Sequence, residues 1–466
     1  MTRRIRGAVG AVLVALALLT GVAPAASAQE APAAAAARPA PLLPIVFVHG
    51  ALGSASQFQT QALRFASNGY PVDHVVGLDY DSLSATGNLA AVWDDLDATI
   101  DAVLADTGAE RVELVGHSLG TFVSQAYLTS TPERAARVAH YVNLDGRPAA
   151  APPAGVPTLA VWGEGSPDRT IVGAENVQFA DQSHTQVATS ASTFAEMYEL
   201  FRGRRPRTTD VLPQVPTHVS LAGEALLFPA NEPAEGSTVE VWRVDPRTGR
   251  RAGRRPAASY PVGPEGTWGP FRADGRATYE MAIVSAPAED GTRTTHHFYA
   301  QPYRRSDHLI RLLTSRPGEG VAALLDRSER HTNLTITRNQ EWWGDQGAAG
   351  DVLTVGDQSV LNAATAPRSK RALAFFAFDD GADGVSHLDA VPEGFGSLPF
   401  LTGADVFVPA ATPPDATIRI ATVGRAGDGE TEVVNVPNWA SSTDAVSVQL
   451  RDYHQHVDAF RRPRGR

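Results

Sequence analysis

The stretch 111–120, Arg-Val-Glu-Leu-Val-Gly-His-Ser-Leu-Gly, constrains the fold more than any other part of the chain. Residues 112–115 predict a short buried strand, and residues 121–128 predict a helix with its apolar side chains on one face. Between them lies a G-x-S-x-G motif, so the order strand, motif, helix is the one that a nucleophile elbow requires. A β-carbon at either glycine would clash in so tight a turn. We therefore expect Ser118 to project from a sharp turn at the amino end of a helix.

Strands and helices alternate on both sides of this stretch. Apolar runs predict five further strands, at residues 44–48, 74–78, 139–144, 156–162 and 176–179. Apolar residues at three- and four-residue steps predict a long helix over 89–104, and a closing helix is expected over 193–201. This alternation is typical of a doubly wound, mostly parallel sheet, whose ligands bind at the carboxyl ends of the strands.

The pattern changes after about residue 207. Helical periodicity nearly vanishes, and short runs of alternating apolar and polar residues are separated by turn signals. We predict an α/β catalytic domain over 42–207 and a β-sandwich-like domain over 208–305. A second all-β region follows over 306–466, either as a separate sandwich or as one continuous barrel with the previous region.

The amino terminus has the pattern of a targeting segment. Three arginines precede an apolar run over 8–19, which is too short to span a bilayer, and Ala26-Ser27-Ala28 matches a signal-peptidase site. We therefore predict a signal peptide over 1–28, an Ala/Pro-rich leader over 29–41, and a secreted protein.

Charge and cysteine content exclude several functions. The formal net charge of -11 argues against nucleic acid as a partner, and the absence of cysteine removes thiolate chemistry and cysteine metal sites. The pair His296-His297 lacks metal-ligand spacing and is expected within a strand. The sequence therefore predicts neither a metal nor a cofactor.

A serine nucleophile requires a base and a group that orients the base. In hydrolases of this layout the chain order is serine, acid, histidine. His140 begins a predicted strand, whereas His184 follows the last predicted strand at its carboxyl end. We take His184 as the base.

Two aspartates compete for the role of the acid. The turn after the 156–162 strand would usually carry a carboxylate before its proline, but here that residue is Ser166, and Asp168 comes two residues later. Asp145 ends the preceding strand and is the first acid at a carboxyl strand end after Ser118. We favour Asp145, with Asp168 as the alternative.

An oxyanion hole requires two preorganised N–H donors. Leu119, directly after the serine, supplies one. The turn after the first strand, His49-Gly50-Ala51, would supply the other, so we assign it to the N–H of Ala51.

Two aromatic stretches, 395–401 and Trp342-Trp343, could cover a lipid-binding site. Clustered aromatic residues are more often part of a core, and we expect that here.

The segments 44–54, 116–120 and 173–184 resemble those of bacterial and archaeal α/β-hydrolase lipases, including the small Bacillus-type lipases. The resemblance covers about residues 42–203. A long all-β tail after such a domain is similar to the Archaeoglobus-type lipase, in which a β-barrel domain helps to bind long acyl chains. The resemblance gives Ser118, His184, Ala51 and Leu119 the roles assigned above, and Asp145 sits where that type carries its acid.

The resemblance implies a secreted serine carboxylic ester hydrolase, a lipase or esterase, that acts on lipid or small ester substrates and contacts lipid surfaces transiently. Two other functions stay open. The same residues could transfer an acyl group to an alcohol other than water. Alternatively, the β region could bind lipid or glycan beside a hydrolase domain that has lost its activity.

Overall fold

The computed structural model describes residues 42–451, apart from 166, 289–290, 317 and 426–428. The predicted signal peptide and the Ala/Pro-rich leader, residues 1–41, lie outside the described residues. Among the residues that are described, no helix is both long enough and apolar enough to cross a membrane.

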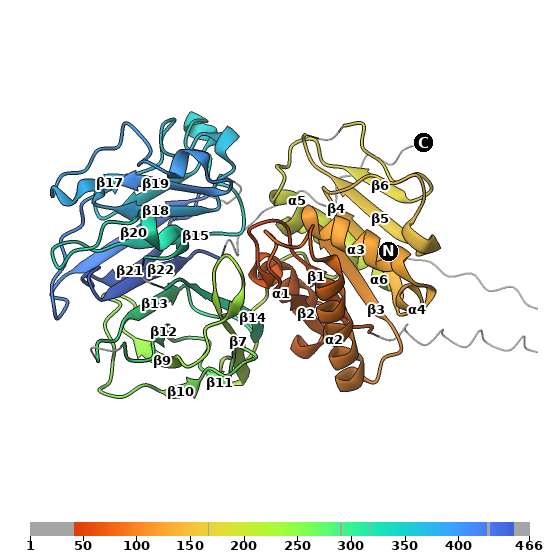
Figure 1. Ribbon diagram of the computed structural model, residues 1–466, viewed down its shortest axis with the longest axis horizontal. Helices are drawn as coiled ribbons and strands as arrows, with labels where there is room; N and C mark the ends of the chain where they lie inside the picture. The colour runs from red at the N-terminus through yellow and green to blue at the C-terminus, as the bar shows by residue number, and fades with distance from the viewer. Residues whose placement is uncertain (1–41, 166, 289–290, 317, 426–428, 452–466) are drawn as a thin grey trace, which may run out of the picture. The chain divides into compact units, whose positions relative to one another are not determined.

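The α/β part, residues 42–207, is built on a six-stranded sheet in which all neighbouring strands are parallel (Figure 1). Its strand order is β2-β1-β3-β4-β5-β6. The strands are β1 (Ile45–Val48), β2 (Val75–Leu78), β3 (Val112–His117), β4 (Val138–Leu144), β5 (Thr158–Trp162) and β6 (Glu175–Gln178). The near-continuous apolar runs form these strands because a parallel sheet is covered on both faces.

Helices cover both faces of this sheet. On one face, α1 (Gln59–Ser67) and α6 (Ala191–Arg202) pack against side chains such as Phe47 of β1. On the other face, α2 (Leu89–Thr107) and α3 (Leu119–Ser130) pack against side chains such as Val46. Two short helices complete this part, α4 (Pro132–Ala136) and α5 (Gln186–Thr189). The predicted doubly wound α/β architecture is confirmed.

The β part, residues 208–451, contains three sheets. An eight-stranded sheet has the order β10-β9-β12-β13-β22-β15-β18-β19, a second sheet joins β11, β7, β14 and β8, and a third has the order β17-β16-β20-β21. The strands are β7 (Val219–Leu227), β8 (Glu232–Pro233), β9 (Thr238–Val244), β10 (Ala258–Pro261), β11 (Thr267–Ala273), β12 (Thr278–Val284), β13 (Thr295–Ala300), β14 (Asp307–Thr314), β15 (Leu334–Thr337), β16 (Val352–Val355), β17 (Gln358–Ser359), β18 (Ala374–Phe378), β19 (Leu401–Asp405), β20 (Thr417–Val423), β21 (Glu432–Pro437) and β22 (Asp444–Gln449).

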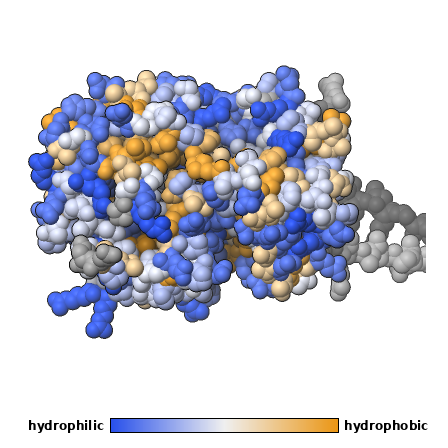
Figure 2. Space-filling view, viewed as in Figure 1, coloured by the Kyte–Doolittle hydropathy of each residue, from blue (hydrophilic) through white to orange (hydrophobic). Residues whose placement is uncertain are grey.

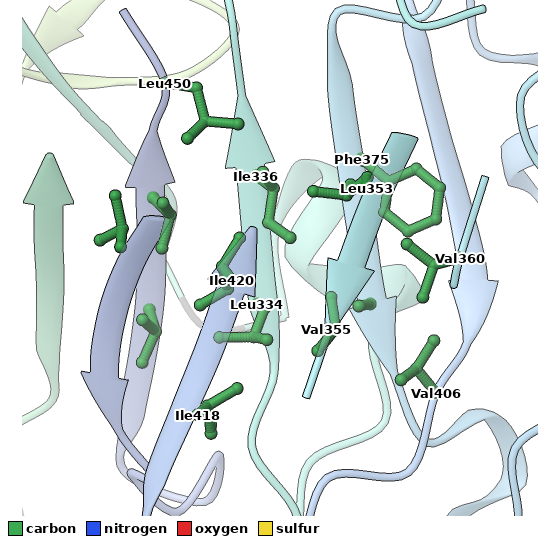
Figure 3. Close-up of a cluster of buried hydrophobic side chains, with 14 of the residues drawn as sticks. Leu334, Ile336, Leu353, Val355, Val360, Phe375, Val406, Ile418, Ile420 and Leu450 are labelled. Atoms are coloured by element: carbon green, nitrogen blue, oxygen red, sulfur yellow. The ribbon is translucent and has the colours of Figure 1, made fainter. Parts of the chain in front are cut away.

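The eight-stranded sheet is shared by two cores. On one face, side chains of β15, β18 and β22 pack against the β16-β20-β21 sheet, as Figure 3 shows for Ile336, Phe375 and Ile420. On the opposite face, β9 and β12 contribute to a second core with β7, β11 and β14. Stacked sheets bury alternate side chains of each strand in this way.

Strand pairing crosses residue 306, the boundary between the β regions in one of the two arrangements predicted from the sequence. β14 lies after that boundary but pairs with β7, which lies before it. The last strand, β22, pairs with both β13 and β15 and so joins the two predicted regions in one sheet. Local patterns do not reveal these pairings because the partners are far apart in sequence.

β14 also ties the β part to the α/β part. Leu309 is buried in the same core as Phe47 and Phe65, whereas the next residue, Ile310, packs in the β7 core. Successive residues of one strand therefore enter two different cores, because their side chains point to opposite faces.

Replacing Leu309 with alanine should lower the free energy of unfolding by about 2–4 kcal/mol, because a buried leucine leaves a cavity when it is shortened. Urea unfolding followed by circular dichroism measures this change. Leu212→Ala is the control, since Leu212 is 43% exposed, and should change the free energy little. Equal effects of the two substitutions would contradict the assignment of Leu309 to a shared core.

Candidate active site

Ser118 stands in the turn between β3 and α3. Its backbone has φ 52° and ψ -118°, a conformation that non-glycine residues rarely adopt. The N–H of Ser118 donates to the carbonyl oxygen of Leu144, the last residue of β4, at 3.0 Å. The strained turn therefore places the hydroxyl at the carboxyl edge of the parallel sheet.

The two motif glycines allow this turn to form. A β-carbon on Gly120 would lie 2.2 Å from the carbonyl oxygen of Val48, and one on Gly116 would lie 2.7 Å from that of Gly120. Both distances are far below van der Waals contact, so any larger residue would push α3 away from β1. This close approach agrees with the clash expected from the sequence.

A continuous series of hydrogen bonds joins the three residues predicted to act together. Nε2 of His184 lies 2.9 Å from Oγ of Ser118, and Nδ1 of His184 lies 2.7 Å from Oδ2 of Asp145. Because an ionised carboxylate only accepts hydrogen bonds, the imidazole proton belongs on Nδ1. Nε2 is then free to accept the hydroxyl proton of Ser118.

Asp145 is buried, with φ 41°, directly after β4. Burial alone would raise the pKa of its carboxyl group, but hydrogen bonds from His184 and from the N–H of Gly163 outweigh burial and lower that pKa to about 2. Asp145 is therefore a carboxylate at neutral pH.

Asp168 and His140 are the alternatives to Asp145 and His184 in the sequence, and the structure gives them other surroundings. Asp168 is exposed in the turn region after β5. His140, within β4, makes its hydrogen bond to Glu113 at 2.8 Å. Neither residue takes part in the series that joins Ser118, His184 and Asp145.

The two predicted oxyanion donors flank the serine. Leu119 is the first residue of α3, so its N–H belongs to the amino end of a twelve-residue helix, where negative charge is stabilised. Ala51 lies in the turn after β1 and, with Gly50 and Leu52, lines the cavity that contains Ser118.

The loop that carries His184 is held from two sides. Nε2 of His117 lies 3.0 Å from the backbone oxygen of His184, and Nδ1 of His117 lies 2.8 Å from Nε2 of Gln57. The amide of Gln57 donates, so His117 carries its proton on Nε2 and donates to His184. Burial lowers the pKa of His117 to about 3 and keeps the ring neutral.

Glu341, from the β part, holds the same loop. Its Oε1 accepts from the N–H of Thr185 at 3.0 Å, and its Oε2 accepts from the hydroxyl of Ser183. The side chain is fully buried. A carboxylate from the β part thus binds the residues on both sides of His184.

The turn after β1 is also supported by the β part. Nδ2 of Asn231 donates to the carbonyl oxygen of Gly53 at 2.8 Å and approaches Nε2 of His49 at 3.4 Å. Nearby, the buried guanidinium of Arg311 donates to Asp79 at 2.6 Å, and Asp79 accepts from the N–H of Ala55. The loop that carries Ala51 therefore lies between groups of both parts.

A cavity of about 260 Å³ opens at Ser118 and His184 and extends over the eight-stranded sheet. Most of its lining is apolar and comes from the β part, including Phe228, Phe298, Leu312, Val321, Leu325 and Phe376. Pockets of this kind, mainly apolar with a few polar groups, are typical of small-molecule sites.

Residues of the two aromatic stretches, 395–401 and Trp342-Trp343, lie partly in cores and partly in the cavity. Trp342 and Phe395 are fully buried in cores of the β part, as expected. Phe400 instead lines the cavity, with its ring stacked 6.4 Å from that of His184. His296 and His297 lie in β13, and the described residues contain no cluster of three or more side chains that could hold a metal ion.

The fold and the series of hydrogen bonds define the class of protein: this is an α/β hydrolase. Family models match three separate segments of the chain. Residues 42–134 match the model of class 2 lipases, residues 217–317 match that of the lipase C-terminal domain, and residues 320–454 match that of a further C-terminal domain. Lipase family models thus match a segment in each of the two parts, residues 42–134 and 217–317.

Solved structures with partial similarity include lipase B of Aspergillus fumigatus, at 14% identity over 36% of this chain and a TM-score of 0.29. The match covers 54% of that lipase, so the chain spans about half of its length. A CIB-like hydrolase from Thermoplasma acidophilum is 15% identical over 35% of this chain and 87% of its own, with a TM-score of 0.26.

The pKa of Asp145 predicts a pH-dependent contribution to stability. A folded-state pKa of about 2, below the usual 3.8, stabilises the fold above about pH 4 by about 2 kcal/mol. That contribution is lost as the pH falls from about 4 toward about 2. Urea unfolding of the wild type and Asp145→Asn should therefore give free energies that differ at about pH 7 and converge in acid. A difference that does not shrink in acid would contradict this account.

Glu341→Gln should lower hydrolytic turnover about 10- to 100-fold while the protein stays folded, because an amide cannot accept both hydrogen bonds and His184 loses its position. Hydrolysis of a chromogenic ester and the melting temperature provide the two measurements. Glu235→Gln, an exposed residue of the β part, is the matched control. Full activity of Glu341→Gln would show that the loop holds its position without this carboxylate.

Proposed function

We propose that this protein is a secreted serine carboxylic ester hydrolase, a lipase or esterase. The observation that carries the proposal is the pair of hydrogen bonds through which His184 joins Ser118 and Asp145, at 2.9 and 2.7 Å. The apolar cavity beside them supports an ester whose acyl group is lipid-like.

In the first half of the reaction, Oγ of Ser118 attacks the ester carbonyl carbon while Nε2 of His184 takes the hydroxyl proton. The N–H groups of Leu119 and Ala51 stabilise the negative charge that develops on the carbonyl oxygen. The carbon–oxygen bond to the alcohol then breaks, and His184 returns the proton to the leaving oxygen. The products are a free alcohol and an acyl ester of Ser118.

In the second half, His184 takes a proton from water as the water oxygen attacks the acyl carbon. Collapse of this intermediate breaks the bond to Oγ, and His184 returns the proton to Ser118. Asp145 stays ionised throughout and stabilises the imidazolium form of His184. One water is consumed, and one carboxylic acid is released.

Contact with lipid surfaces belongs to the same proposal. Figure 2 shows hydrophobic residues gathered on one face of the β part. Exposed apolar patches often mark sites of interaction with other molecules or membranes. We infer that this hydrophobic face of the secreted enzyme binds transiently to the lipid surface that contains its substrate.

Ser118→Ala should reduce hydrolysis of p-nitrophenyl esters by roughly 10⁴-fold or more, because the acyl-enzyme cannot form. Release of p-nitrophenol measures the rate, and a fluorophosphonate probe should label the wild type and not the variant. Retained turnover in Ser118→Ala would refute the proposal.

The matched pair Asp145→Asn and Asp168→Asn separates the two candidate acids. Only Asp145→Asn should lose activity, since Asp145 makes the hydrogen bond to His184 and Asp168 is exposed after β5. The reverse result would move the acid to Asp168 and leave the ester hydrolase proposal intact.

A further inference from the structure

The face of the eight-stranded sheet that lines the cavity carries a strip of polar side chains on two neighbouring strands, β22 and β15. In one row across the sheet, Ser447 of β22 pairs with Thr335 of β15, and in the next row Gln449 pairs with Thr337. All four residues line the cavity. With His296 of the neighbouring strand, they form what we call the polar strip.

The strip differs from the rest of the same face. Toward one edge, Val241 and Met281 are buried beneath the β7 sheet. Toward the other edge, Phe376 and Phe378 are buried against Phe395. Where the cavity covers the face, β22 and β15 present hydroxyl and amide groups, whereas the flanking strands β13 and β18 contribute the apolar side chains of Phe298 and Phe376.

The alternation of residues along β15 and β22 shows that these strands separate two environments. Leu334 and Ile336 of β15 point into the core between the sheets (Figure 3). Val446 and Val448 of β22 are buried in the same core. The residues between them point to the cavity. A cavity face built for plain hydrocarbon would be expected to carry apolar residues on these strands too.

Hydrogen bonds orient part of the strip. His296 lies 2.8 Å from Oγ of Ser447 and 2.9 Å from Oγ1 of Thr314, and its ring stacks on Phe298 at 4.1 Å between centroids. Gln449 donates to Oε1 of Gln59 at 3.0 Å. In contrast, the hydroxyls of Thr335 and Thr337 have no hydrogen-bond partner within the described part of the chain.

The charges around the strip favour a neutral ligand. Burial lowers the pKa of His296 to about 3, so its ring is neutral. The two arginines that line the cavity are paired with carboxylates, Arg311 with Asp79 and Arg338 with Asp351. Hydroxyl groups, which both donate and accept, match the Thr, Ser and Gln side chains better than an anion does.

From these observations we infer that the acyl chain of the substrate carries hydroxyl groups, which bind to the polar strip while its methylene groups contact Phe298 and Phe376. This inference rests on the proposed ester hydrolysis at Ser118. A plain alkyl chain would displace water from Thr335 and Thr337 without replacing its hydrogen bonds, and that loss disfavours binding.

The test compares esters of octadecanoic acid with esters of its positional hydroxy isomers, all with the same alcohol. For the wild type, the ratio of kcat/KM for the best hydroxylated ester to that for the plain ester should be about ten or more, the effect of one net hydrogen bond or more. A ratio near one for every isomer would overturn the inference.

The double variant Thr335→Val, Thr337→Val removes two hydroxyls and keeps the shape of both side chains. This variant should lower the ratio of kcat/KM for the best hydroxylated ester to that for the plain ester about ten-fold or more. Thr354→Val, on the β16 sheet outside the cavity, is the control and should leave the ratio unchanged. If the double variant does not fold, Ser447→Ala provides the same comparison, and an unchanged ratio in a folded strip variant would also overturn the inference.

The same panel separates this inference from the proposed function. A wild type that hydrolyses no ester, including short-chain p-nitrophenyl esters, contradicts the ester hydrolase itself. A wild type that hydrolyses the plain esters as fast as the hydroxylated ones contradicts only the role of the polar strip.

Discussion

The structure depends on how closely the turn at Ser118 approaches the end of β1. The α-carbon of Gly120 faces the carbonyl oxygens of Val48 and His49 so tightly that no side chain fits between them. This contact brings the amino end of α3 beside the turn that carries Ala51. The proposed nucleophile and both proposed oxyanion donors therefore gather at one point, because two glycines allow two backbone segments to touch.

A second constraint comes from the β part, which supports the site as well as covering it. Asn231 binds the turn after β1, and Glu341 binds the loop around His184. These side chains are buried, so their hydrogen bonds are shielded from competing water. The α/β part has its own sheet and helices, but the position of its two critical loops is shared with the β part.

The α/β part and the β part also share a hydrophobic core and the cavity. β14 places Leu309 in the core of the α/β part and Ile310 in the core beside β7. The eight-stranded sheet packs against partner sheets at both of its faces, and residues of β13, β22, β15, β18 and β19 line the cavity. Within the cavity this face is polar on β22 and β15 and apolar at Phe298 of β13 and Phe376 of β18.

The sequence by itself determined the α/β architecture, the strained turn at Ser118 and the choice of His184, because these depend on local periodicity, on glycine and on chain order. It left Asp145 and Asp168 as alternatives, and it left open whether the β part is two regions divided at residue 306 or one continuous barrel. Only the tertiary structure decided that Asp145 meets His184 and that Glu341 and Asn231 hold the site loops. Those contacts join residues many positions apart, and no local pattern marks a buried polar side chain whose partner lies in another part of the fold.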